Sequence, residues 1–168
     1  MILDNFGILA GAISAAGAVS GQLVTSTGNT LSANTIDLAP LSLGGNQAGD
    51  TGGGEPLEIS ISVLQTLTSG GAATVQFQMI QADDAALSSN VQVINQTDAF
   101  AYTALTAGTI VPLHWDRAAP YAPKRFVGLR FVVGAAALTN GTGQFFASVA
   151  KSVQDVKNIY FKSGFTVA

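Results

Sequence analysis

The chain has 168 residues, a formal net charge of −3 and no cysteine. This length suits one domain, since single cores commonly run to about 100–200 residues, and the lack of cysteine excludes disulfides, thiolate metal sites and cysteine nucleophiles. Charged residues make up 10% of the chain, well below the roughly 25% of an ordinary soluble domain. Charges are depleted where surfaces are buried against partners. This composition therefore favours a protein whose surface is largely covered by neighbouring proteins.

The charges are divided unevenly along the chain. Residues 1–116 carry nine acids and no Lys or Arg, which gives −9, whereas residues 117–168 carry seven bases and one acid, which gives +6. Such a division favours charge complementarity between copies of the chain. The alternative is that both parts fold together and their charges mix over one surface.

The N-terminal part is rich in small residues. Residues 2–19 are apolar, but Asp4, the lack of a basic n-region and the abundance of Ala, Gly and Ser argue against a signal peptide or a membrane-spanning helix. Small side chains bury little area, so this part does not stabilise itself. We therefore expect an extended or weakly structured N-terminal arm over residues 1–33 and a folded domain over residues 34–168.

The domain shows strand patterns. Apolar residues alternate with polar ones over residues 57–63 and again over residues 75–79, with a turn at residues 68–71 between them. We expect these two strands to pair with each other in antiparallel fashion. Pro112 lacks a backbone donor, which predicts an edge position for its strand. Further strands are expected at residues 35–39, 91–95, 100–105, 109–115, 127–133, 144–151 and 158–162.

Eight or nine strands without intervening helices predict an all-β fold, an antiparallel β sandwich that is jelly-roll-like. One helical turn is expected at residues 83–88, with Asp83 as the capping residue. The alternative role of Asp83 and Asp84, a cation site, is less favoured because a hard cation needs about six or more oxygen ligands.

The residues offer little chemistry. His114 is the single histidine, and no G-x-S-x-G pattern marks a nucleophile for it to activate. Asp50-Thr51-Gly52 matches the aspartic-protease triplet but lies in a glycine-rich loop without a preceding apolar strand. The sequence therefore predicts no enzyme, no catalytic residue, no cofactor and no metal site. A sequence pI of about 4.7 also argues against direct nucleic-acid binding.

Several short segments carry a family resemblance. In chain order they are MILD at 1–4, TIDL at 35–38, GGEPL at 53–57, TSGGAATVQFQ at 68–78, ADDA at 82–85 and KRFVGLR at 124–130. This ordered set resembles a family of capsid cement (decoration) proteins of tailed bacteriophages. The resemblance implies a jelly-roll-like fold, a homo-dimer or homo-trimer, binding to the major capsid protein on the outer surface of the virion, and no enzyme activity.

From this resemblance and the composition we expect a cement protein that bridges neighbouring major capsid proteins without contacting nucleic acid or membrane. The candidate contacts with the capsid or between subunits are Ile2, Leu3 and Phe6 on the arm, and a basic group of Arg117, Lys124 and Arg125. The alternative function is a carbohydrate-binding β-sandwich module or adhesin, with Tyr102, Trp115 and Tyr121 as the available aromatic platforms. A small hydrolase would need His114.

Overall fold

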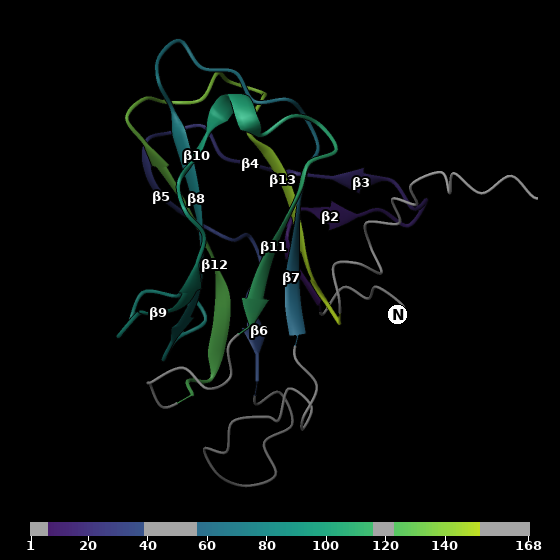
Figure 1. Cartoon of the computed structure of the whole chain (residues 1–168). Helices are drawn as coiled ribbons and strands as arrows, with labels where there is room; N and C mark the ends of the chain where they lie inside the picture. Colours follow the sequence, from purple (N-terminus) through teal and green to yellow (C-terminus); the bar gives the residue numbers. More distant parts are fainter. Residues whose placement is uncertain (1–6, 39–56, 116–122, 152–168) are drawn as a thin grey trace, which may run out of the picture.

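The computed structural model describes residues 7–38, 57–115 and 123–151. Two antiparallel sheets pack face to face, and a small hairpin of β2 (Ala12–Ile13) and β3 (Val19–Ser20) projects from one side (Figure 1). The all-β antiparallel sandwich expected from the sequence is therefore confirmed. The described part holds no α-helix, and its one helical element is the 3₁₀ turn η2 (Tyr102–Ala104).

Each sheet combines strands from distant parts of the chain. The first sheet has the order β1 (Ile8–Ala10), β13 (Gln144–Ala150), β7 (Leu57–Val63), β11 (Ile110–Trp115), with β4 (Gln22–Leu23) also paired to β13. The second sheet has the order β10 (Phe100–Ala101), β8 (Thr74–Ala82), β12 (Phe126–Gly134), β5 (Gly28–Leu31), with β6 (Ile36–Asp37) paired to β12 and β9 (Gln92–Gln96) paired to β8.

The pairing of β7 with β8, which the sequence predicts, is wrong. β7 pairs with β13 and β11 in the first sheet, whereas β8 pairs with β12, β9 and β10 in the second. Leu67, within the connecting segment, and Ala73, its last residue, are both buried in the core, because this segment crosses from one sheet to the other. The alternation of apolar residues identifies the buried face of a strand, but it does not identify the partner strand.

The N-terminal segment also differs from the expected arm. β1 pairs with β13, and β5 pairs with β12, so parts of residues 8–31 belong to both sheets. Leu9 and Val24 are buried in the common core, which explains why a segment of mostly small residues is ordered on the domain. Residues 1–6 lie outside the described ranges.

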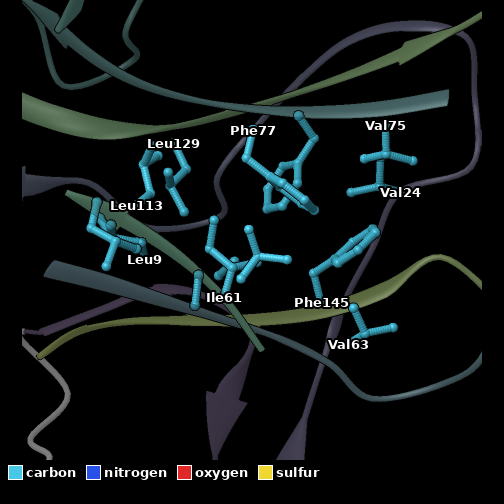
Figure 2. Close-up of a cluster of buried hydrophobic side chains, with 14 of the residues drawn as sticks. Leu9, Val24, Ile61, Val63, Val75, Phe77, Leu113, Leu129 and Phe145 are labelled. Carbon is cyan, nitrogen blue, oxygen red and sulfur yellow. The ribbon is translucent and has the colours of Figure 1, made fainter. Parts of the chain in front are cut away.

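The core lies between the sheets and is centred on three phenylalanines. Phe77 and Phe131 come from the second sheet and Phe145 from the first, and all three are fully buried. The ring centroids lie 5.9 Å apart for Phe77–Phe131, 5.5 Å for Phe77–Phe145 and 5.3 Å for Phe131–Phe145. Figure 2 shows Phe77 and Phe145 among aliphatic side chains of both sheets. Rings at these distances contribute stability beyond the area they bury.

The strands β11 and β10 test two local predictions, an edge position for one strand and the length of the other. β11 is the last strand in the order of its sheet, so the edge position predicted from Pro112 is confirmed. The strand expected at residues 100–105 is shorter, because β10 ends at Ala101 and η2 follows. Leu105, whose N–H donates to the carbonyl of Tyr102, is buried in the core by this turn. The strand expected at residues 158–162 lies outside the described residues.

Two buried serines provide a matched test of this packing. The Ser32 hydroxyl accepts from the backbone N–H of Leu129 at 3.0 Å and donates to the Asn34 carbonyl at 2.8 Å. The Ser60 hydroxyl is buried and has no hydrogen-bond partner among the residues that the structure describes. We expect Ser32→Ala to lower the free energy of unfolding by about 1–3 kcal/mol, because it leaves a buried N–H unpaired.

We expect Ser60→Ala to be neutral or stabilising, since it removes a buried hydroxyl that forms no bond. Urea unfolding of both variants measures the two changes under the same conditions. A larger loss for Ser60→Ala than for Ser32→Ala would contradict the assigned hydrogen bonds.

Candidate binding surface

Of the predicted basic contacts, the structure describes Lys124 and Arg125, and both are paired within the chain. Lys124 Nζ lies 2.8 Å from Asp83 Oδ1. Arg125 binds Asp37 through Nε to Oδ1 and Nη2 to Oδ2, each at 2.8 Å, and its guanidinium carbon lies 4.9 Å from the ring centroid of Phe126. Ile2, Leu3, Phe6 and Arg117 lie outside the described residues.

These two ion pairs shift the pKa values of groups that form them. The hydrogen bond from Lys124, followed by that from Asn90, lowers the pKa of Asp83 below its usual range. The hydrogen bond with Asp37 raises the pKa of Arg125. Both pairs join an acid of residues 1–116 to a base of residues 117–168. For these pairs, the two oppositely charged parts of the chain fold together and neutralise each other, which leaves neither base as a free cation.

The segment between β8 and β9 is a turn held by Asp84, not by Asp83 as predicted. Asp84 Oδ1 accepts from the backbone N–H groups of Ser88 and Ser89, at 2.9 and 2.7 Å, and Oδ2 accepts from the Ser88 hydroxyl at 2.7 Å. These bonds, with the one from the Ser88 hydroxyl first, lower the pKa of Asp84. The carboxylate therefore has a structural role in closing this turn.

The remaining candidate residues do not converge. His114 is exposed on the edge strand β11, opposite Glu58 of β7, and its backbone carbonyl accepts from Asn95 Nδ2 at 2.9 Å. Over residues 7–38, 57–115 and 123–151, no group of three His, Cys, Asp or Glu residues is placed to hold a metal ion. In the same ranges, no helix has the length and apolar composition needed to cross a bilayer.

The aromatic residues considered for carbohydrate binding are not arranged as a platform in the described part. Trp115 is only 6% exposed and belongs to the core cluster. Tyr102 is half-buried and packs against the same cluster. Tyr121 lies outside the described residues. Trp115 therefore closes the end of the core, and its ring face is not offered to a ligand.

Two surface features do stand out, and the first is an exposed region without charge. Residues 5–36 contain no charged side chain, yet residues 14–20, including most of the projecting β2–β3 hairpin, are exposed (Figure 1). Val19 is 49% exposed, Leu23 47% and Leu31 36%, and these are the exposed large hydrophobic residues of the described part. Exposed apolar residues on an uncharged surface are typical of regions that partners cover.

The second feature is a polar network on the outer face of the second sheet. Gln76 and Gln78 of β8 alternate with the core residues Val75 and Phe77, so they lie on the opposite face. Arg130 of β12 lies opposite Gln78 in the register, and its Nε donates to Gln78 Oε1 at 2.7 Å. We call Gln76, Gln78, Gln96 and Arg130 the amide–arginine network.

The amide–arginine network is not predicted from the sequence, although part of the signal for it is present there. Gln78 and Arg130 occupy polar positions in strongly alternating strands, which assigns both to solvent-facing sides. What the alternation does not contain is the strand neighbour, and only the pairing of β8 with β12 brings the two side chains together.

Comparison with known proteins gives a family. A family model described as Bbp16 matches residues 18–149, which is more than half of the chain. Because this match covers more than half of the chain, the chain belongs to the Bbp16 family. No curated protein matches the chain significantly. The match includes both sheets apart from β1 and the last residue of β13, and it includes the amide–arginine network.

Proposed function

We propose that this member of the Bbp16 family is a structural, non-enzymatic protein of the virion, a capsid cement protein that binds the outer surface of a phage head. Its partner in this proposal is the major capsid protein, and copies of the chain associate with one another as a dimer or trimer. The chain would bridge neighbouring capsid proteins and so stabilise the shell.

The observation that carries the proposal is the uncharged exposed region of the N-terminal segment. A free soluble domain commonly covers such a surface with Lys, Glu, Arg and Asp. Here the exposed residues from Ala12 to Leu31 are small, apolar or neutral polar side chains. Permanent burial against a shell protein or another copy explains why solubilising charges are missing from this surface.

The strand order supports the jelly-roll part of the proposal. With the short strands β4, β6 and β10 left aside, the order is β1–β13–β7–β11 in one sheet and β5–β12–β8–β9 in the other. Along the chain each of these strands lies in the other sheet from its predecessor, except β9, which pairs with β8. Jelly rolls are double-sheet sandwiches of eight strands, and they recur in viral capsid and lectin domains. This architecture is compatible with a capsid role, and the function itself must come from the surface.

The proposed mechanism is additive. A standard protein–protein interface of roughly 1,600 Å² has an affinity anywhere between micromolar and picomolar, depending on its best contacts. Each bound copy would add interface that shell expansion has to break. Because many copies bind one closed shell, modest individual contacts sum to a large resistance against internal pressure.

The experiment that tests this function is binding to phage heads assembled without the protein. Purified chain is mixed with expanded heads and co-sedimented, with bound and free protein quantified over a concentration series. The proposal predicts saturable binding with a fixed number of copies per head. Absence of binding, together with affinity for immobilised glycans, would favour the carbohydrate-binding alternative and overturn the cement proposal.

A further inference from the structure

We propose that Arg130 binds a carboxylate of an acidic side chain on the partner protein, which makes the outer face of the second sheet a docking surface. The inference rests on the proposed function in one respect, namely that the partner is the shell protein. Its geometric basis is a cation that is held in a fixed position and has no ion-pair partner among residues 7–38, 57–115 and 123–151.

Arg130 is held by a glutamine that is itself immobilised. Gln78 is 8% exposed, and its Nε2 donates to Gln76 Oε1 at 3.2 Å and to Gln96 Oε1 at 2.8 Å. Gln76 Nε2 in turn donates to the backbone carbonyl of Thr97 at 2.9 Å. With both amide hydrogens of Gln78 used in this way, its Oε1 faces the guanidinium, which carries donors only. The orientation of Arg130 is therefore fixed through Gln78 and Gln76 by a hydrogen bond to the Thr97 backbone.

The network leaves most of the guanidinium's binding capacity unused. Nε is bound to Gln78, whereas within the described residues Nη1 and Nη2 have no protein acceptor and no carboxylate forms an ion pair with Arg130. Lys124 and Arg125, which directly precede the same strand, are each neutralised by an aspartate. Arg130 differs from them because its hydrogen-bond partner is the neutral amide of Gln78.

A carboxylate is the chemistry that this arrangement fits. Arginine presents planar paired N–H groups that match the two oxygens of a carboxylate, and such charge-assisted bidentate bonds are among the strongest polar contacts. Arg130 is half-buried, so its charge is partly removed from water, and a partner's negative charge would compensate it. The pre-oriented side chain also loses little conformational entropy on binding.

The surroundings of Arg130 are those of an interface centre. Leu31 of β5 lies directly opposite it in the register and is 36% exposed, and directly opposed residues share a face. Gln76, Gln78 and Gln96 supply neutral polar neighbours. Arginine is enriched among the residues that dominate binding energy, with near-neutral contacts around it that exclude water. An acidic residue flanked by an apolar one is the expected complement.

The test compares three variants of the full chain for binding to heads that lack the protein. Arg130→Gln removes the charge, Arg130→Lys keeps the charge but not the bidentate geometry, and Arg125→Gln removes a cation that is already paired with Asp37. We expect Arg130→Gln to weaken binding about tenfold or more and Arg130→Lys by less. The sequence predicts Arg125 as a contact, but Asp37 neutralises it within the chain, so Arg125→Gln should stay within about twofold of the wild type.

Salt provides a second readout that loss of structure would not mimic. The affinity of the wild type should fall as salt rises, and the affinity of Arg130→Gln should fall less, because a screened charge pair has been removed. Circular dichroism and thermal unfolding confirm that each variant is folded. Arg130→Lys keeps the test decisive if Arg130→Gln does not fold.

Three outcomes overturn the inference in distinguishable ways. If the wild type binds heads and both folded Arg130 variants bind equally well, the role of Arg130 is wrong but the cement function stands. If Arg130→Gln changes the oligomeric state in light scattering but not the affinity for heads, the carboxylate belongs to a second copy. If the wild type itself does not bind heads, the proposed function fails first.

Discussion

Replacing Phe77 by alanine is expected to lower the free energy of unfolding by about 3–5 kcal/mol. The Phe77 ring contacts rings from three other strands, with its centroid 5.9 Å from Phe131, 5.5 Å from Phe145 and 6.2 Å from Phe100. Alanine would remove these contacts and leave a cavity between two sheets that are held apart by the remaining side chains. Since a domain is commonly stable by only about 5–15 kcal/mol, this is a large fraction of the total.

Phe126→Ala is the matched control for Phe77→Ala. Phe126 is half-buried and packs at the edge of a small outer cluster of Ile80, Ala82 and Leu87. Its truncation removes less buried area and leaves a hollow that water can enter, so the expected loss is less than half of that for Phe77→Ala. Urea unfolding midpoints and slopes of both variants decide the comparison. Equal losses would contradict the central position of Phe77.

Gly143→Ala is expected to lower the free energy of unfolding by about 2–3 kcal/mol. A Cβ atom at residue 143 would overlap the backbone carbonyl oxygen of Val24, lie 3.0 Å from its carbonyl carbon and 3.1 Å from Leu138 Cδ1. The close approach is fixed by a 2.7 Å hydrogen bond from the Val24 N–H to the Gly143 carbonyl. The overlapping Val24 carbonyl is a backbone group, so it cannot move aside by a side-chain rotation. The N-terminal segment would have to shift instead.

Gly70→Ala is the control for the glycine prediction. A Cβ atom at Gly70 would meet no atom within 4 Å, and its φ lies outside the positive region. The substitution should therefore be neutral, or stabilising by about 0.4–1 kcal/mol through the unfolded chain. Thermal unfolding measures both variants. If Gly143→Ala were as stable as Gly70→Ala, the packing of the N-terminal segment on β13 would be wrong.

The sequence predicted the strands better than it predicted their partners. The strand of residues 57–63 has the expected bounds, because a period of two with Ile59 and Ile61 on one side is a local property. Its pairing with β13 depends on residues more than 80 positions away. Neither alternation nor turn composition contains that information. Proximity in sequence predicts a β7–β8 hairpin, and this prediction is wrong.

The N-terminal segment shows the limit of an argument from average composition. Small residues dominate it, which suggests that it cannot contribute to a core. Two of its larger side chains, Leu9 and Val24, nevertheless reach the core, and the surrounding glycines allow the backbone to approach closely. At Gly11 the positive φ of 85° and the contact with the Ser20 carbonyl both require the absence of a side chain. Whether such a segment packs against the core depends on a few positions and not on its average composition.

The candidate site was the least predictable part. The charges of Lys124 and Arg125 are visible in the sequence, and their neutralisation by Asp83 and Asp37 is not, since each pair spans more than 40 residues. The same limit concealed Arg130, which resembles its neighbours in sequence and differs from them in having glutamine as its partner. The availability of a cation for binding is a property of the fold.

The measurement that tests the central claim most directly is the temperature at which heads release their DNA. DNA-filled heads lacking the protein are heated with a fluorescent DNA dye, with and without a saturating amount of the purified chain. A cement protein is expected to raise the release temperature in proportion to the number of copies bound. An unchanged release temperature on heads that co-sedimentation shows to be saturated would contradict the account.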